Sequence, residues 1–342
     1  MPHLNVALVG FGNVGRALVR LLAAKRPVLE AQYGITFTIT GIATGRHGMA
    51  INPAGIDLER VLELVSSGQS LDALSTQPVS PSVLDFIRAC PANVLFENTP
   101  VNHLTGQPAV DHLRAALEQG MHAITANKGA VVHAYRELRD LAQRQGRRFF
   151  FESTVMDGAP IFSLFRGPLP AVELRAFHGI LNSCTNLLLE RMESGQSFDA
   201  AVAYAQSIGI AETDPSADID GWDAAIKVAA LATVLMGIPL KPQEVDRQGI
   251  RGITPSMIAA ARQAGERWKL VCRAVRKHGK VTAQVAPQRV SPLSPLYSIT
   301  GTSSYVQFEM DVLPGLGIVE SNPGPETTAY GLLADFINAV RQ

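Results

Sequence analysis

The chain has 342 residues, 46% of them hydrophobic, and its 30 Lys and Arg residues are balanced by 30 Asp and Glu residues. This length exceeds what a single hydrophobic core usually supports, so we expect two domains. A formal net charge of zero lacks the basic excess of nucleic-acid-binding proteins, and it leaves self-association open.

The cysteines and the N-terminus indicate the cellular setting. Cys90, Cys184 and Cys272 are odd in number and lack CxxC spacing, so neither a disulfide framework nor a zinc site is expected. We find no signal-peptide pattern and no apolar run of about 18 residues that could span a bilayer. These features predict a cytoplasmic protein without nucleic-acid or membrane partners.

The first half of the chain alternates short apolar runs with helical patterns. Strands that alternate with helices require crossover connections, and they predict a parallel sheet. Pro27 is expected to end the first helix, which starts at the end of a glycine-rich turn. The predicted strands cover 4–9, 37–43, 94–96, 122–125 and 147–151, with a further helix over 110–118.

The composition changes after the loop at 151–160. Strand patterns at 174–180 and 281–285 favour antiparallel pairing, and the last helix, over 327–340, should pack back on the first domain. We therefore predict a first domain over 1–145, completed by 325–342, and a second over 146–324. Helices are expected at 185–193, 198–208 and 221–236, and the buried face of the last helix at Leu332, Leu333, Phe336, Ile337 and Val340.

The spacing GxGxxG lies between the first strand and the first helix. Its first glycine permits a tight turn, the second lets a pyrophosphate approach the main chain, and the third lets helix and strand pack closely. The helix N-terminus also offers N–H groups to phosphates. The alternative is a tight turn without a ligand. We predict a dinucleotide-binding turn made of Gly10, Phe11, Gly12, Asn13, Val14 and Gly15.

The residues after the second strand bear on the cofactor's ribose. NAD enzymes usually carry Asp or Glu there, whereas this chain reads Thr44-Gly45-Arg46-His47. Arg46 could bind a 2′-phosphate, which favours NADP over NAD. The alternative is that Arg46 is a solvated loop cation.

The second half contains a charged pair on an apolar helix. Asp223 and Lys227 are four residues apart, so they share one helix face. A surface ion pair is the simple interpretation. However, the surrounding helix is mostly apolar, and a polar substrate would compensate buried charges. The carboxylates near this helix do not fit a calcium loop, so no divalent metal site is expected.

Several motifs follow one another along the chain: residues 10–15, Asn98-Thr99-Pro100, Thr125-Ala126-Asn127-Lys128-Gly129, 152–160, 179–182 and 212–227. Together they resemble homoserine dehydrogenase over nearly the whole chain. The resemblance implies a Rossmann-type domain and an α+β catalytic domain whose mixed or antiparallel sheet helps to form a homodimer. It also implies NAD(P)H-linked interconversion of L-aspartate 4-semialdehyde and L-homoserine, a step of threonine, isoleucine and methionine synthesis. The length corresponds to the short form without a regulatory domain.

The resemblance implies roles at the active site. Lys227 is our preferred proton donor, with Lys128 polarising the substrate oxygen, because the pKa of a lysine falls when it is desolvated. Glu212 and Asp223 would bind the substrate ammonium or orient Lys227. Asn182 would reach the substrate carboxylate or the nicotinamide ring of the cofactor. The cofactor site is completed by Asn98, Thr99, Pro100 and Lys128.

Two segments depart from the common family pattern. Glu152, Val155, Asp157 and Ala159 match positions that hold a monovalent cation such as Na⁺ through carbonyl oxygens, but Met-Asp-Gly-Ala follows the valine here in place of Gly-Ala-Gly. Cys184 stands where threonine is common, so it is either a reactive thiol near the substrate or a small buried residue.

Three other functions compete with this one. A related amino-acid or semialdehyde dehydrogenase could use the same scaffold, since fold does not fix substrate. A dinucleotide-sensing regulator would have no reason to keep Lys128, Asp223 and Lys227 together. A P-loop NTPase is excluded because GxxxxGK[ST] does not occur.

Overall fold

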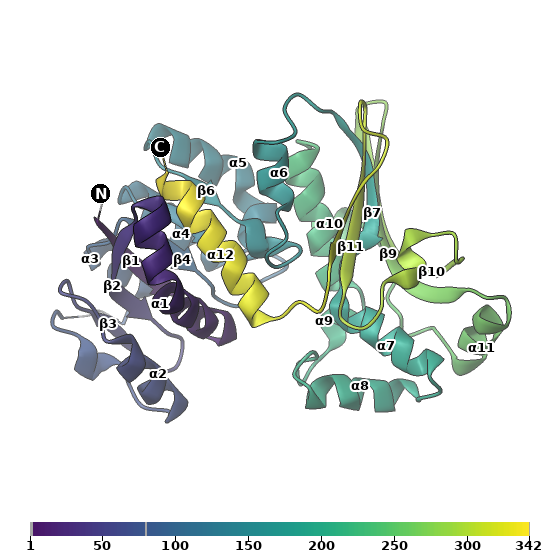
Figure 1. Cartoon of the computed structure of the whole chain (residues 1–342), viewed down its shortest axis with the longest axis horizontal. Coiled ribbons are helices and arrows are strands. Elements are labelled where there is room, and N and C mark those ends of the chain that lie inside the picture. The colour runs from purple at the N-terminus through teal and green to yellow at the C-terminus, as the bar shows by residue number, and fades with distance from the viewer. Residues whose placement is uncertain (1–2, 79–80, 342) are drawn as a thin grey trace. The chain divides into compact units, whose positions relative to one another are not determined.

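The structure is a computed structural model that describes residues 3–78 and 81–341 (Figure 1). It forms two compact units, Met1–Pro160 with Gly324–Gln342, and Ile161–Pro323. The first unit extends past residue 145 because the segment after its last strand is bonded to the C-terminal helix. There the Ser153 hydroxyl donates to the Thr328 carbonyl at 2.7 Å. Within the described residues, no helix is long and apolar enough to cross a membrane.

The first unit is built on a six-stranded sheet in the order β3-β2-β1-β4-β5-β6. All neighbouring strands are parallel except β2 and β3, which pair antiparallel, so the predicted parallel sheet is confirmed and gains an edge strand. Chain order reverses between β1 and β4, and ligands of such sheets bind beyond the strand ends at that point. The strands are β1 His3–Val9, β2 Thr36–Ala43, β3 Met49–Ile51, β4 Val94–Glu97, β5 His122–Thr125 and β6 Phe149–Phe150.

Helices cover this sheet, and the C-terminal helix α12 packs against α1 (Figure 1). Phe336 of α12 is fully buried, with its ring centroid 6.1 Å from that of Phe37 and 5.9 Å from that of Phe96. The last helix therefore completes the core of the first unit. The helices are α1 Asn13–Tyr33, α2 Leu58–Ser66, α3 Val83–Ala89, α4 Ala109–Glu118, α5 Lys128–Arg144 and α12 Pro325–Val340, with 3-10 turns η1 Asp72–Leu74 and η2 Glu152–Thr154.

The predicted end of the first helix at Pro27 is wrong, because α1 continues to Tyr33. Proline removes one amide from the helical ladder, but Pro27 lies on the exposed side, where water can satisfy the freed carbonyl. Buried Leu29 anchors the last turns, and Gly34 ends the helix in the left-handed conformation with φ +65°.

The second unit contains another six-stranded sheet, in the order β12-β11-β7-β9-β10-β8. Neighbouring strands in this sheet pair antiparallel, except for the short parallel pair β8–β10. The predicted mixed or antiparallel sheet is therefore confirmed. The prediction missed most of its strands and gave only part of β10. The strands are β7 Leu174–Ile180, β8 Asp246–Arg247, β9 Arg267–Lys277, β10 Lys280–Val290, β11 Ser304–Met310 and β12 Leu316–Glu320.

Two helices of this unit position three of the predicted site residues, Asn182, Asp223 and Lys227. Helix α7 starts directly after β7, with Asn182 as its N-cap, and α10 contacts β9 and β10 along a mostly buried face. The sheet thereby fixes both segments. The helices are α6 Ile161–Arg166, α7 Ser183–Glu193, α8 Phe198–Ser207, α9 Ser216–Ile219, α10 Trp222–Leu235 and α11 Pro255–Gln263, with 3-10 turns η3 Pro242–Glu244 and η4 Pro295–Ser298.

Candidate active site

The glycine-rich turn joins β1 to α1 with the geometry that a dinucleotide requires. Gly10 has φ +89°, and a Cβ on it would lie 2.5 Å from the main-chain carbonyl of Asn98. A Cβ on Gly15 would lie 2.8 Å from the Gly10 oxygen, so helix and strand touch here. Gly12 faces open space, with no heavy atom within 4 Å of an added Cβ. That space is where a pyrophosphate would approach the main chain.

The first turn of α1 suits an anion. Its N-cap is Gly12, which has no side chain to cap the free N–H groups, and no acidic residue lies in the first turn. Arg16 adds a guanidinium, which donates to the Asn13 side chain at 2.7 Å. The N–H groups, the helix dipole and this cation would all attract phosphate oxygens.

Asn98 supplies an independent sign of a ligand. Both polar atoms of its side-chain amide are buried, and neither has a hydrogen-bond partner within the described part of the chain. Leaving a buried amide unsatisfied costs about 1–3 kcal/mol per group. The main-chain N–H of Asn98 donates to the Val9 carbonyl at 2.7 Å, which ties this residue to the end of β1. The amide therefore fits a polar group of a bound dinucleotide.

The residues predicted to face the cofactor's ribose form a tight turn after β2. The Thr44 hydroxyl donates to the Gly48 carbonyl at 2.9 Å and accepts from the His47 N–H at 2.7 Å. Arg46 lies exposed on this turn. The exposed carboxylate of Asp72 lies beside Gly48, so an acidic group is close as well, although the sequence did not reveal it.

Lys128 is the first residue of α5 and is half-buried. Its helix is capped by Asn127, whose side-chain oxygen accepts from the Gly129 N–H at 3.0 Å. The Asn127 amide also donates to the Thr99 carbonyl at 3.0 Å. The structure thus brings Lys128 and the 98–100 segment together at the carboxyl ends of β4 and β5.

The second unit brings three predicted residues together. The Lys227 ammonium lies 3.2 Å from the Asp223 carboxylate and donates to the Leu181 carbonyl at 2.7 Å. Both side chains are largely buried, with 16% and 14% of their surface exposed. A buried ion pair of this kind needs further hydrogen bonds to offset desolvation, and it differs from a solvated surface pair.

Asn182 joins this pair to a carboxylate that the sequence analysis did not assign. Its amide nitrogen donates to Asp218 at 2.6 Å and to Asp223 at 3.0 Å. Its oxygen accepts from the N–H and the hydroxyl of Thr185, both at 2.8 Å. The sequence shows two aspartates in the 212–227 motif, Asp218 and Asp220, without a feature that separates them. Only the fold shows that Asp218 is the one that contacts Asn182.

Glu212 is not brought into this cluster. It lies on an exposed loop after α8, and its main-chain carbonyl accepts from the Gln206 side chain at 3.1 Å. Its carboxylate would need either the substrate or a loop movement to meet the other charged groups.

The predicted cation segment bends sharply within the first unit. Glu152 donates its N–H to Asp335 at 2.6 Å, and Asp157 adopts φ +36° while accepting from the Thr328 hydroxyl at 2.5 Å. Over 3–78 and 81–341, no group of three His, Cys, Asp or Glu side chains gathers as a metal site. A cation bound at Val155 and Ala159 would therefore depend on main-chain carbonyls.

Comparison with known proteins decides the family. A family model described as homoserine dehydrogenase matches residues 160–337, and a model of the homoserine dehydrogenase NAD-binding domain matches residues 10–152. The chain belongs to the homoserine dehydrogenase family. The members of this family are NAD(P)-dependent oxidoreductases.

Relatives and solved structures of homoserine dehydrogenases cover nearly the whole chain. The NAD(+)-dependent enzyme of Pseudomonas canavaninivorans is 34% identical over 99% of this chain and 96% of the relative. The enzyme of Methanocaldococcus jannaschii is 34% identical over 98% of both chains. A putative homoserine dehydrogenase from Archaeoglobus fulgidus superimposes with TM-score 0.86 at 29% identity, covering 98% of both chains. A hyperthermophilic archaeal homoserine dehydrogenase in complex with NADPH gives 0.82 at 29% identity, covering 99% of this chain and 98% of that one.

Cys184, which departs from the homoserine dehydrogenase pattern, is a buried free thiol. Burial raises its pKa, and the neighbouring carboxylate of Asp218 raises the pKa further. Burial also raises the pKa of Cys272 to about 12. Both thiols therefore stay protonated at neutral pH, which favours the interpretation of Cys184 as a small buried residue.

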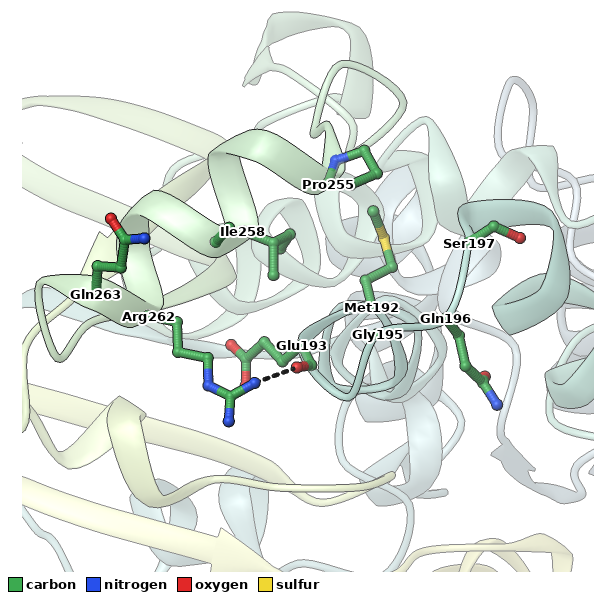
Figure 2. A pocket seen from close by; sticks show the side chains of 10 residues that line it. Met192, Glu193, Gly195, Gln196, Ser197, Pro255, Ile258, Arg262 and Gln263 are labelled. Atoms are coloured by element: carbon green, nitrogen blue, oxygen red, sulfur yellow. Dashed lines mark hydrogen bonds between the residues drawn. The ribbon is translucent and has the colours of Figure 1, made fainter.

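The second unit also contains a surface pocket of about 650 Å³ between the end of α7 and α11 (Figure 2). Met192 and Ile258 supply apolar surface, and the Arg262 guanidinium donates to the Glu193 carbonyl at 3.5 Å. None of the substrate-binding residues predicted for a homoserine dehydrogenase lines it.

Proposed function

We propose that this chain interconverts L-aspartate 4-semialdehyde and L-homoserine with a nicotinamide dinucleotide. The buried cluster of Asp223, Lys227 and Asn182 carries the proposal, because it offers a proton-bearing ammonium beside carboxylates that suit an amino acid. When bound, the dinucleotide supplies or accepts the hydride. The glycine turn and the unsatisfied Asn98 amide would hold it.

Lys227 is proposed to exchange the proton with the substrate oxygen. Its ammonium is fixed by Asp223 at 3.2 Å and by the Leu181 carbonyl at 2.7 Å, and such fixed geometry is what proton transfer needs. Lys128 is proposed to polarise the same oxygen, since a cation there stabilises the developing alkoxide.

The substrate ammonium is proposed to bind between Asp223 and Glu212, with Asp218 adding a third carboxylate. Charge-assisted hydrogen bonds of this kind are short and strong. The Asn182 amide already contacts Asp218, Asp223 and Thr185, so we assign it the positioning of these carboxylates.

NADP is proposed as the preferred cofactor, with Arg46 binding the 2′-phosphate. The exposed guanidinium on the turn after β2 supports this choice. Asp72 supports the opposite choice, since a carboxylate near the ribose favours NAD. The relatives also differ, one being named NAD(+)-dependent and another being solved with NADPH.

A monovalent cation and a homodimer complete the proposal. The carbonyl oxygens of Glu152, Val155, Asp157 and Ala159 are ligands of the type that Na⁺ prefers. Exposed apolar side chains of the β11–β12 hairpin, including Val312 and Val319 with 66% and 55% of their surface exposed, support association of two copies.

Initial rates of homoserine oxidation with NADP and with NAD, each with and without added NaCl, test the function directly. We expect turnover with homoserine, faster with NADP, and little with serine or threonine. Equal rates with a different hydroxy amino acid would favour another dehydrogenase on this scaffold. Absence of any turnover with intact dinucleotide binding would favour a sensor.

A further inference from the structure

Beneath the 98–100 segment lies a carboxylate that the sequence analysis did not assign. Glu97 is the last residue of β4, and its side chain is fully buried. One carboxylate oxygen accepts from the Thr99 N–H at 3.1 Å and from the Thr99 hydroxyl. The other lies 3.0 Å from the Thr125 hydroxyl, which also reaches the Glu97 carbonyl at 2.8 Å. The buried imidazole of His112 on α4 lies 3.6 Å away.

A buried carboxylate is costly unless it is well paired, and the partners of Glu97 come from two separate segments of the chain. Thr99 lies in the loop after β4, whereas Thr125 ends β5. The Thr125 hydroxyl accepts from the Asn127 N–H at 2.9 Å, and the Asn127 amide donates back to the Thr99 carbonyl at 3.0 Å. These bonds form a closed ring that joins the two loops through the Glu97 side chain.

The ring of hydrogen bonds is directly connected to two groups that the proposed reaction needs. Asn127 caps α5 by accepting from Gly129, and this places Lys128 at the first position of the helix. Asn98, with its unsatisfied amide, lies between Glu97 and Thr99. A movement of the ring would therefore shift the Lys128 ammonium and the Asn98 amide together.

We propose that Glu97 is a positioning residue, which sets the Asn98–Pro100 loop and Lys128 in one fixed arrangement through Thr99 and Thr125. It rests on the proposed function for the role of Lys128. Glu97 contacts neither substrate nor cofactor in this scheme, because its oxygens are occupied by the two threonines. The two carboxylate oxygens can accept from the Thr99 N–H, the Thr99 hydroxyl and the Thr125 hydroxyl together. The amide of a glutamine has only one accepting oxygen, so its NH2 group would either oppose the Thr99 N–H or require the Thr125 hydroxyl to accept instead of donate.

The test compares Glu97→Gln with Glu137→Gln, an exposed glutamate of α5 that pairs with Arg114. We expect Glu97→Gln to lower kcat about thirtyfold while KM for homoserine changes less than threefold, and to weaken NADPH binding about tenfold. Glu137→Gln should change none of these. The parent's turnover of homoserine tests the proposed function, whereas the NADPH affinity of the variant tests the positioning role even without turnover.

A double-mutant cycle separates positioning from general destabilisation. Because Glu97 acts through Lys128, adding Glu97→Gln to the Lys128→Met variant should lower its kcat by less than threefold. If Glu97→Gln fails to fold, the pair Thr125→Val and Thr125→Ser replaces it, with loss of kcat expected in the first and retention in the second. The proposal would be overturned if Glu97→Gln left both kcat and NADPH affinity unchanged. It would also be overturned if the losses of kcat from Glu97→Gln and Lys128→Met multiplied fully in the double variant, or if the two Thr125 variants were equally active.

Discussion

The two units present different kinds of groups that could bind a charged ligand. The first unit offers main chain: a glycine turn, a free helix N-terminus and space where Gly12 has no side chain. The second unit offers side chains: Lys227 and Asp223, held by Asn182 and the Leu181 carbonyl. A main-chain site recognises what every dinucleotide shares, whereas a cluster of charged side chains can select one substrate and move a proton.

The largest expected effect comes from removing Lys227, the proposed proton donor of the second unit. Lys227→Ala should lower kcat by a factor of about 1,000 or more while the Kd of NADPH stays within threefold, because the ammonium acts in the chemical step. Steady-state kinetics and fluorescence titration measure the two quantities. Lys280→Ala, at an exposed lysine of β10, is the control. Turnover within a few-fold of the parent would remove Lys227 from its role.

A second prediction concerns a buried lysine that lies outside the cluster. Lys269 of β9 is 1% exposed and donates to Asn186 at 2.8 Å, and burial lowers its pKa from 10.5 to about 8. Between pH 8 and pH 10.5 the unfolded chain therefore binds more protons at this residue than the folded chain does. The contribution of Lys269 to the free energy of unfolding should rise across this range by up to about 3 kcal/mol.

Urea unfolding of the parent and of Lys269→Met at pH 7.5, 8.5 and 9.5 measures this contribution as a difference. Methionine is unbranched and only one atom shorter than lysine, and it removes the titrating group. Lys277→Met, at the exposed end of the same strand, should unfold in parallel with the parent. A constant difference between parent and Lys269→Met across the pH series would contradict the lowered pKa.

The third prediction tests the main-chain site. Gly10→Ala combines φ +89° with a Cβ placed 2.5 Å from the Asn98 main chain, so the turn must move. We expect dinucleotide affinity to fall roughly a hundredfold. Gly68→Ala has a similar φ of +73° but open space around its Cβ. It is therefore the control for backbone strain without a clash between the new Cβ and a neighbouring main chain. Equal affinity in Gly10→Ala and Gly68→Ala would show that the close approach is unimportant.

The smallest effect should come from the ribose end. Arg46→Ala should weaken NADPH binding about tenfold and leave NADH binding within twofold, because only NADPH carries the 2′-phosphate that the cation would contact. Arg20→Ala, on the exposed side of α1, serves as the control. Equal losses for both cofactors would contradict the NADP preference, and tighter NADPH binding in Asp72→Asn would identify Asp72 as the residue that favours NAD.

The strand, the glycine turn and the helix at the start of the chain could be predicted from sequence, because glycine spacing and apolar periodicity are local features. The charged helix was recognised for the same reason, since Asp223 and Lys227 are separated by one turn. Pro27 was misjudged because its exposure on α1 depends on tertiary packing. Most strands of the second sheet were missed, since β9 mixes charged residues with apolar ones and includes the buried Lys269.

Residues that act through others were the hardest to predict. Asp218 and Glu97 carry no local signal that separates them from other carboxylates, and their partners Asn182 and Thr125 lie about 30 residues away or more in sequence. Only the sheet order, which places β4 beside β5, brings such residues into hydrogen-bond distance.

The packing of α12 has a consequence for biosynthesis. Phe336 fills the core between Phe37 and Phe96, yet the ribosome makes it after the entire second unit. The nascent first unit would therefore expose an apolar gap throughout translation of residues 161–323, a period in which chaperones can bind it. Truncation before Pro325 should thus yield a chain that aggregates, even though every residue of the glycine turn is present.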